Sequence, residues 1–213
     1  MFTKRRGNRS TALSFILLTV AAACFLIFIF SQQSASTPNP AAGKPAEKTE
    51  KTLAGSAPIL PFSMPTSISI PSIDVQSTLI TVGKNPDGTI GVPGADNYNK
   101  AAWYRNSPAP GQLGSSIIEG HVDYVDKGPA IFFRLGNLKL DDKITVERQD
   151  GISAIFKVDE LAVYQKDEFP TEKVYAINDR PALVLITCGG QFNGTIGEYD
   201  SNVVVYASLV KPS

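Results

Sequence analysis

The 213-residue chain has little cysteine or histidine: Cys24 and Cys188 are its two cysteines, and His121 is its single histidine. A zinc site normally takes three or four Cys, His or carboxylate ligands, so we expect no metal centre, and we expect no cofactor. The chain also lacks net charge, because 20 basic residues balance 20 acidic ones. Phosphate binding needs a basic surface, so a nucleic-acid partner is not expected.

One long apolar run lies near the N-terminus. Residues 11–30 (TALSFILLTVAAACFLIFIF) contain no charge and have about the length of a membrane-spanning helix. The basic residues precede it within residues 1–10, which predicts a cytoplasmic N-terminus and an extracellular remainder. The alternatives are a cleaved signal peptide or a lipoprotein signal ending at Cys24. Residues 25–30 continue the apolar run past the alanines, which favours an uncleaved, single-pass anchor.

The segment after this run has the composition of a tether. Residues 31–57 are rich in Ser, Thr, Pro, Ala, Lys and Glu and contain no aromatic residue, so they cannot bury enough apolar surface to fold. We therefore expect a flexible extracellular linker, followed by one folded domain at residues 58–213. With Cys24 in the membrane, a disulfide to Cys188 is not expected, and Cys188 should be a free thiol.

The pattern from residue 58 onward is mainly β. Short apolar or alternating runs are separated by turn signals such as Asn85-Pro86-Asp87-Gly88 and Asp150-Gly151. These runs predict strands at residues 67–70 (an early edge strand continuing through 73–75), 78–82, 115–120, 143–148, 152–164, 182–187 and 202–210, and a short helix at 129–135. Many short strands and few helical periods favour an antiparallel or mixed closed barrel.

Two of the predicted strands end in residues that can carry chemistry. The run 182–187 is followed by Cys188 and two glycines, and the run 115–120 is followed by His121. A free cysteine is more often a small core hydrophobe, and a lone histidine is more often structural. Two strand ends can nevertheless place both residues at one rim, where imidazole activates a thiol. The joint pattern favours a catalytic pair.

Several motifs resemble those of class F sortases over roughly residues 68–210. They are Trp103–Asp123 (WYRNSPAPGQLGSSIIEGHVD), Gly128–Leu138 (GPAIFFRLGNL), Leu183–Phe192 (LVLITCGGQF) and Asn202–Ala207 (NVVVYA). The resemblance implies an eight-stranded β-barrel with short helices behind one transmembrane helix. It also implies a membrane-anchored cysteine transpeptidase that cleaves an LPXTG-type signal between Thr and Gly. The thioacyl-enzyme would then pass the substrate protein to a cell-wall amine.

The resemblance assigns roles to individual residues. Cys188 would be the acylated nucleophile, His121 the proton donor and acceptor, and Thr187 a hydrogen-bond donor near the oxyanion. The family's third catalytic residue is an arginine near the strand after the nucleophile, but residues 191–202 contain no arginine or lysine. Asn202, Arg105 and Arg134 are the candidates for its place.

Three functions follow from these observations. The first is the transpeptidase, with sorting-signal proteins and a cell-wall amine as partners. The second is a hydrolase of the same chemistry that uses water as the acceptor. The third is a non-catalytic or weakly active extracellular peptide-binding barrel, which the missing arginine favours. Papain-like chemistry fits less well, because the cysteine there precedes its histidine in the sequence.

Overall fold

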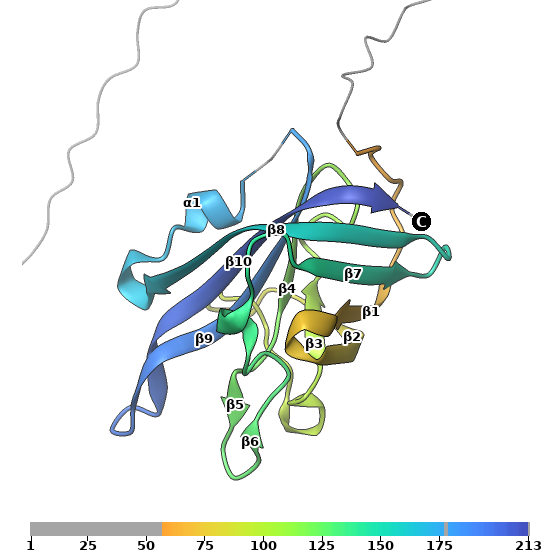
Figure 1. Ribbon diagram of the computed structural model, residues 1–213. Coiled ribbons are helices and arrows are strands. Elements are labelled where there is room, and N and C mark those ends of the chain that lie inside the picture. The colour runs from red at the N-terminus through yellow and green to blue at the C-terminus, as the bar shows by residue number, and fades with distance from the viewer. Residues whose placement is uncertain (1–56, 177–178, 213) are drawn as a thin grey trace, which may run out of the picture. The chain divides into compact units, whose positions relative to one another are not determined.

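Eight strands form a closed barrel in the part of the chain that the computed structural model describes, residues 57–176 and 179–212 (Figure 1). Neighbouring strands pair in the order β1–β2–β3–β4–β9–β10–β8–β7, and β7 pairs with β1 to close the barrel. The strands are β1 (Pro65–Ile70), β2 (Val75–Val82), β3 (Ala101–Tyr104), β4 (Gly114–Glu119), β7 (Lys143–Arg148), β8 (Ser153–Gln165), β9 (Pro181–Asn193) and β10 (Glu198–Pro212). The predicted mainly β fold with a closed eight-stranded barrel is confirmed.

The other elements are short and lie between barrel strands. They are the two-stranded sheet of β5 (Asp123–Tyr124) and β6 (Gly128–Pro129), the 3-10 helices η1 (Pro71–Ile73), η2 (Ala95–Asn97), η3 (Leu135–Asn137) and η4 (Lys166–Glu168), and the helix α1 (Thr171–Val174). The helix predicted at 129–135 is wrong: Pro129 ends β6, and turns follow it. The Phe132 N–H donates to the His121 carbonyl at 3.0 Å, which ties this segment to a neighbouring loop instead of a helical turn.

Alternating side chains divide the strands into two faces. Leu183 and Leu185 of β9 belong to the main buried cluster inside the barrel. Val184 of β9, Ile117 of β4 and Val204 of β10 belong to a second buried cluster on the other face. β4 is buried along its whole length, because both of its faces are covered. β9 is likewise buried or half-buried on both faces from Pro181 to Gly189.

β9 does not end at Cys188, contrary to the prediction. It continues to Asn193 and forms a long hairpin with β10, whose tip extends to the same end of the barrel as the β5–β6 hairpin (Figure 1). The two glycines serve close packing within this hairpin. A Cβ on Gly189 would lie 2.7 Å from the Val203 side chain. Gly190 has φ 80° beside a shift in strand register, and a Cβ there would collide with Asp200.

The first predicted strand also differs from the structure. Ile73 lies in η1 rather than in a continuing strand, because Asp74 adopts a left-handed conformation with φ 54° and donates its N–H to the Pro71 carbonyl. β1 is not an edge strand, since it pairs with both β2 and β7. The turn at Asn85 is confirmed by a hydrogen bond from the Gly88 N–H to the Asn85 carbonyl at 3.0 Å.

The predicted N-terminal segments lie outside the described residues. These are the basic N-terminus 1–10, the membrane-spanning segment 11–30 with Cys24, and all but the last residue of the linker 31–57. Among the residues that the structure describes, no helix is long and apolar enough to cross a bilayer. Cys188 is a free thiol.

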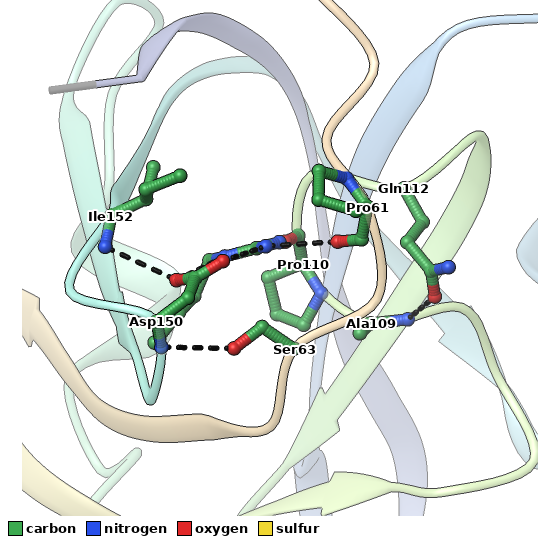
Figure 2. Close-up of polar contacts among 8 residues, drawn as sticks. Pro61, Ser63, Ala109, Pro110, Gln112, Asp150 and Ile152 are labelled. Atoms are coloured by element: carbon green, nitrogen blue, oxygen red, sulfur yellow. Dashed lines mark hydrogen bonds and ion pairs between the residues drawn. The ribbon is translucent and has the colours of Figure 1, made fainter.

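The Arg148 side chain is fully buried and connects three segments at the closing seam of the barrel. Its guanidinium donates to the Pro110 carbonyl at 2.5 Å, the Pro61 carbonyl at 2.8 Å and both carboxylate oxygens of Asp150 (Figure 2). The Asp150 N–H in turn donates to the Ser63 hydroxyl at 3.1 Å. Hydrogen bonds from Arg148 lower the pKa of Asp150. A buried cation is stable only with such partners.

Arg148→Ala is expected to lower the free energy of unfolding by about 3–5 kcal/mol, because it leaves buried acceptors and a carboxylate without their cation. Urea denaturation at pH 7 measures this change. The control is Arg134→Ala, which removes a 2.9 Å ion pair to Asp74 in which the two side chains are 51% and 77% exposed. We expect this control to change stability by less than about 1 kcal/mol. Equal losses of unfolding free energy in the two variants would contradict the proposal that burial of Arg148 makes its contacts important for stability.

Candidate active site

His121 and Cys188 lie at the same end of two neighbouring strands. β4 and β9 pair in parallel, and Glu119 opposite Ile186 is their last paired position. The Gly120 N–H continues the ladder by donating to the Ile186 carbonyl at 3.2 Å. His121 and Cys188 each follow two residues after this last pair. The structure therefore brings the two predicted residues to the same level of adjacent strands.

The His121 ring contacts the connection between β2 and β3. Its Nε2 lies 2.7 Å from the Pro93 carbonyl oxygen, and the Tyr124 ring packs edge-on at a centroid distance of 5.4 Å. Because a carbonyl only accepts, Nε2 carries the hydrogen in this bond, which leaves Nδ1 as the basic nitrogen of the neutral ring. Among the described residues, no hydrogen bond joins His121 to the Cys188 thiol.

The Cys188 thiol is partly buried and has acidic neighbours. Burial raises the pKa of the thiol, and the charges of Glu119, Glu198 and Asp123 raise it further, whereas the positive charge of Lys166 lowers it. The thiol is therefore protonated at neutral pH. Within the described ranges, no group of three or more His, Cys, Asp or Glu side chains is arranged to hold a metal ion.

A hydrogen bond connects the loop of His121 to the hairpin of Cys188. The Tyr199 hydroxyl of β10 donates to the Asp123 carboxylate at 2.5 Å, and Asp123 begins β5 two residues after His121. This hydrogen bond raises the pKa of Tyr199 to about 12, because loss of the phenol proton would place two anions side by side. The contact holds the two chain segments of the site together.

Glu119 is a buried acid that the sequence analysis did not single out. Its side chain lies at the end of β4 with 9% exposure, and Oε1 has no hydrogen-bond partner. Burial raises the pKa of Glu119 to about 8, so the carboxyl is largely protonated at pH 7. The sequence signal for this buried acid was an acidic residue at the end of an otherwise apolar run, two residues before His121.

Asn202 lies directly opposite Cys188 in the β9–β10 ladder. Paired residues in an antiparallel ladder point to the same face, so the Asn202 side chain is a neighbour of the thiol. Thr187 precedes Cys188 in β9 and therefore points to the other face, where its hydroxyl is buried without a partner. Its hydroxyl does not serve the site as the sequence analysis expected.

The two candidate arginines lie elsewhere. Arg134 pairs with Asp74 beside η1. Arg105 follows β3, which runs antiparallel to β4, so it lies toward the end of β4 that is opposite to His121. The cation whose charge acts on Cys188 is Lys166, the first residue of η4. Sequence reasoning missed it, because only the pairing of β8 with β10 brings it to the site.

The second buried cluster covers the outer face of the barrel beside Cys188. Val184 and Ile186 of β9 lie on the same face as Cys188 by alternation; Val184 belongs to this cluster and Ile186 packs against it. A pocket of about 380 Å³ opens over this face and is lined by Lys84, Gly88, Ile90, Tyr104, Phe169, Thr171 and Tyr175. Tyr104 belongs to the outer cluster, and Ile90 and Phe169 pack against it.

Glu119→Gln is expected to change the pH dependence of stability. The carboxyl ionises near pH 4.5 in the unfolded chain and near pH 8 in the fold, so the folded protein loses stability as the pH rises between these values. Glutamine does not ionise. Calorimetry should therefore give the variant a Tm several degrees above wild type at pH 9, with the advantage absent at pH 5. Glu172→Gln, at an exposed position of α1, is the control. A pH 9 advantage absent from Glu119→Gln, or equal in the control, would contradict the assignment.

Comparisons with known proteins are consistent with this geometry. The sortase domain family model matches residues 68–210. Comparison with curated protein sequences finds no significant match. Among solved structures, sortase A from Corynebacterium diphtheriae (a lid mutant) has a TM-score of 0.53 and 23% identity, over 69% of this chain and 70% of that one.

Two further solved structures have the same fold. Sortase C1 from Streptococcus agalactiae has a TM-score of 0.53 and 20% identity, over 68% of this chain and 66% of that one. Sortase C-1 from Actinomyces oris has a TM-score of 0.52 and 21% identity, over 68% and 73%. The chain thus spans about two thirds of the length of these structures. Because the sortase model covers more than half of the sequence and includes both His121 and Cys188, the chain belongs to the sortase family.

Proposed function

We propose that the protein is an extracellular cysteine transpeptidase, of class F by its motifs, that acts on proteins with an LPXTG-type sorting signal. The observation that carries this proposal is the pair formed by His121 and Cys188 at the same level of β4 and β9 in a sortase domain. Transfer of the cleaved protein to a cell-wall amine is the reaction that the family resemblance implies.

The sorting signal would bind on the outer face of the barrel. Strand alternation puts the Cys188 side chain on this face, and the 380 Å³ pocket is lined in part by Tyr104 of the outer cluster and by Ile90 and Phe169, which pack against it. A peptide with leucine and proline before its cleavage site would bury these side chains there while its threonine carbonyl reaches the thiol. Apolar burial of this kind contributes roughly 25 cal/mol per Å².

Acylation would begin from a neutral thiol, since the pKa of Cys188 is raised. The sulfur attacks the threonine carbonyl carbon while its proton passes to the His121 ring, which leaves a tetrahedral carbon bearing an oxyanion. The C–N bond then breaks, and the glycine amine takes the proton from His121. A thioester joins Cys188 to the threonine. Nδ1 of His121 would take and return this proton, because Nε2 donates to the Pro93 carbonyl.

Deacylation reverses these proton movements. The incoming amine gives a proton to His121 and attacks the thioester carbon, a new amide bond forms, and the Cys188 sulfur leaves and regains its proton from His121. Water in place of the amine would yield a free carboxylate, which is the hydrolase alternative. A site that binds the peptide without forming the thioester is the binding-module alternative.

We place the enzyme on the outer face of the cell membrane. Residues 11–30 would form the single-pass anchor, with the basic residues 1–10 in the cytoplasm, and residues 31–57 would tether the catalytic domain at 58–213. The distribution of basic residues before the apolar run supports this orientation. A domain tethered in this way would lie beside the membrane surface, where substrate proteins emerge after they cross the membrane.

Intact-mass spectrometry of the full chain in detergent, incubated with a small library of sorting peptides, tests the chemistry. We expect one acyl adduct, on Cys188, and none in Cys188→Ala. Cys24→Ser is the matched control, because it removes the other cysteine of the chain and should leave the adduct unchanged. His121→Ala should slow acylation by about 10²- to 10⁴-fold, through loss of general acid–base catalysis.

The products separate the three functions. With an added amine, a transpeptidase gives an amide, whereas a hydrolase gives the free acid with or without the amine. Peptide binding with no adduct on Cys188 would support the non-catalytic module instead. An adduct that survives in Cys188→Ala would exclude Cys188 as the nucleophile.

A further inference from the structure

The oxyanion that forms beside Cys188 has acidic neighbours. Residues 191–202 contain no basic residue, and the negative charges of Glu198 and Asp123 act on the thiol. A negative oxygen in partly buried surroundings of this kind is stable only if a donor or a cation faces it. The question for catalysis is which positive group the fold supplies.

The strand register places Lys166 close to the level of the thiol. β10 lies between β8 and β9, and Asn202 of β10 pairs with Cys188 on one side and with Tyr164 on the other. β8 ends one residue later at Gln165, and Lys166 follows it as the first residue of η4. The backbones of β8 and β9 are two strand spacings apart, about 10 Å. A lysine's four-carbon stem reaches across most of this gap.

The ammonium group contacts Glu198, the first residue of β10. Lys166 Nζ lies 2.9 Å from Glu198 Oε2, and the lysine side chain is 35% exposed. An ammonium has three N–H donors, and Glu198 takes one of them. The position of the charge agrees with its effect on the thiol, whose pKa is raised by burial and lowered by Lys166.

We propose that Lys166 is the cation that stabilises the oxyanion of the scissile carbonyl, in place of the arginine that class F sortases carry near the next strand. This proposal rests on the proposed transpeptidase function. The ammonium shares its charge with Glu198 in the resting enzyme and turns a free N–H toward the oxyanion as it forms. Lysine provides a point charge rather than the two-pronged contact of a guanidinium.

The rate of thioester formation tests this directly, in the full chain in detergent with a Cys24→Ser background. Lys166→Met keeps the length of the side chain and removes its charge, and we expect acylation to slow by about 10²- to 10³-fold. Lys166→Arg should retain most of the rate. The matched control is Lys157→Met, because Lys157 is also a partly exposed lysine paired with a carboxylate, that of Asp141.

Alkylation of Cys188 by iodoacetamide, measured against pH, provides a second test that needs no sorting peptide. The thiol profile should shift to higher pH in Lys166→Met and to lower pH in Glu198→Gln, since Glu198 raises the pKa of the thiol. Lys157→Met should leave the profile unchanged.

The outcomes distinguish this inference from the proposed function. A thioester that forms as fast in Lys166→Met as in wild type, with the rate lost in Asn202→Ala instead, would overturn the role of Lys166 alone. An unshifted alkylation profile in Lys166→Met would also overturn it. Failure of the wild-type protein to form any thioester would overturn the proposed function and the role of Lys166 with it.

Discussion

The parallel pairing of β4 with β9 is the constraint on which the site depends. It sets the level of His121 against that of Cys188, and it requires a crossover between strands that are far apart in the sequence. The barrel maintains this pairing from both sides, since β4 also pairs with β3 and β9 also pairs with β10. The hydrogen bond between Tyr199 and Asp123 adds a second connection just beyond the paired residues.

Burial at this end of the barrel disfavours the charged forms of two ionisable side chains. The Cys188 thiol and the Glu119 carboxyl both have raised pKa values, with burial as the main cause. The thiol and the Glu119 carboxyl are therefore both largely neutral at pH 7, so in the proposed reaction the thiol proton passes to His121 during the attack. The proposed role of Lys166 requires its ammonium group to turn from Glu198 toward the oxyanion.

Local sequence patterns predicted the two strands that lead to His121 and Cys188. Apolar runs that end in Cys188 and His121 predicted strands, and the structure has a strand at each place. The pattern did not reveal β3 (Ala101–Tyr104), which has only four residues, or the extension of β9 past its glycines, which depends on pairing with β10. Tertiary contacts decide such cases.

The contributions of Glu119 and Lys166 were hidden for the same reason. Glu119 is unusual only because β3 and β9 bury it, and Lys166 lies near Cys188 only because β8 and β10 are paired in one register. Neither the burial of Glu119 nor the position of Lys166 can be predicted from the residues next to His121 and Cys188 in the sequence. In contrast, the candidate arginines were chosen by residue type, and the fold pairs Arg134 with Asp74 and places Arg105 toward the other end of β4 from His121.

The most direct measurement of the central claim is a crystal structure of the protein after reaction with a sorting peptide. The account predicts continuous density from the Cys188 sulfur to the threonine carbonyl carbon. It also predicts the carbonyl oxygen turned toward β10 and Lys166, with Nδ1 of His121 directed at the leaving-group position. A peptide bound along the outer face with Cys188 unmodified would contradict it.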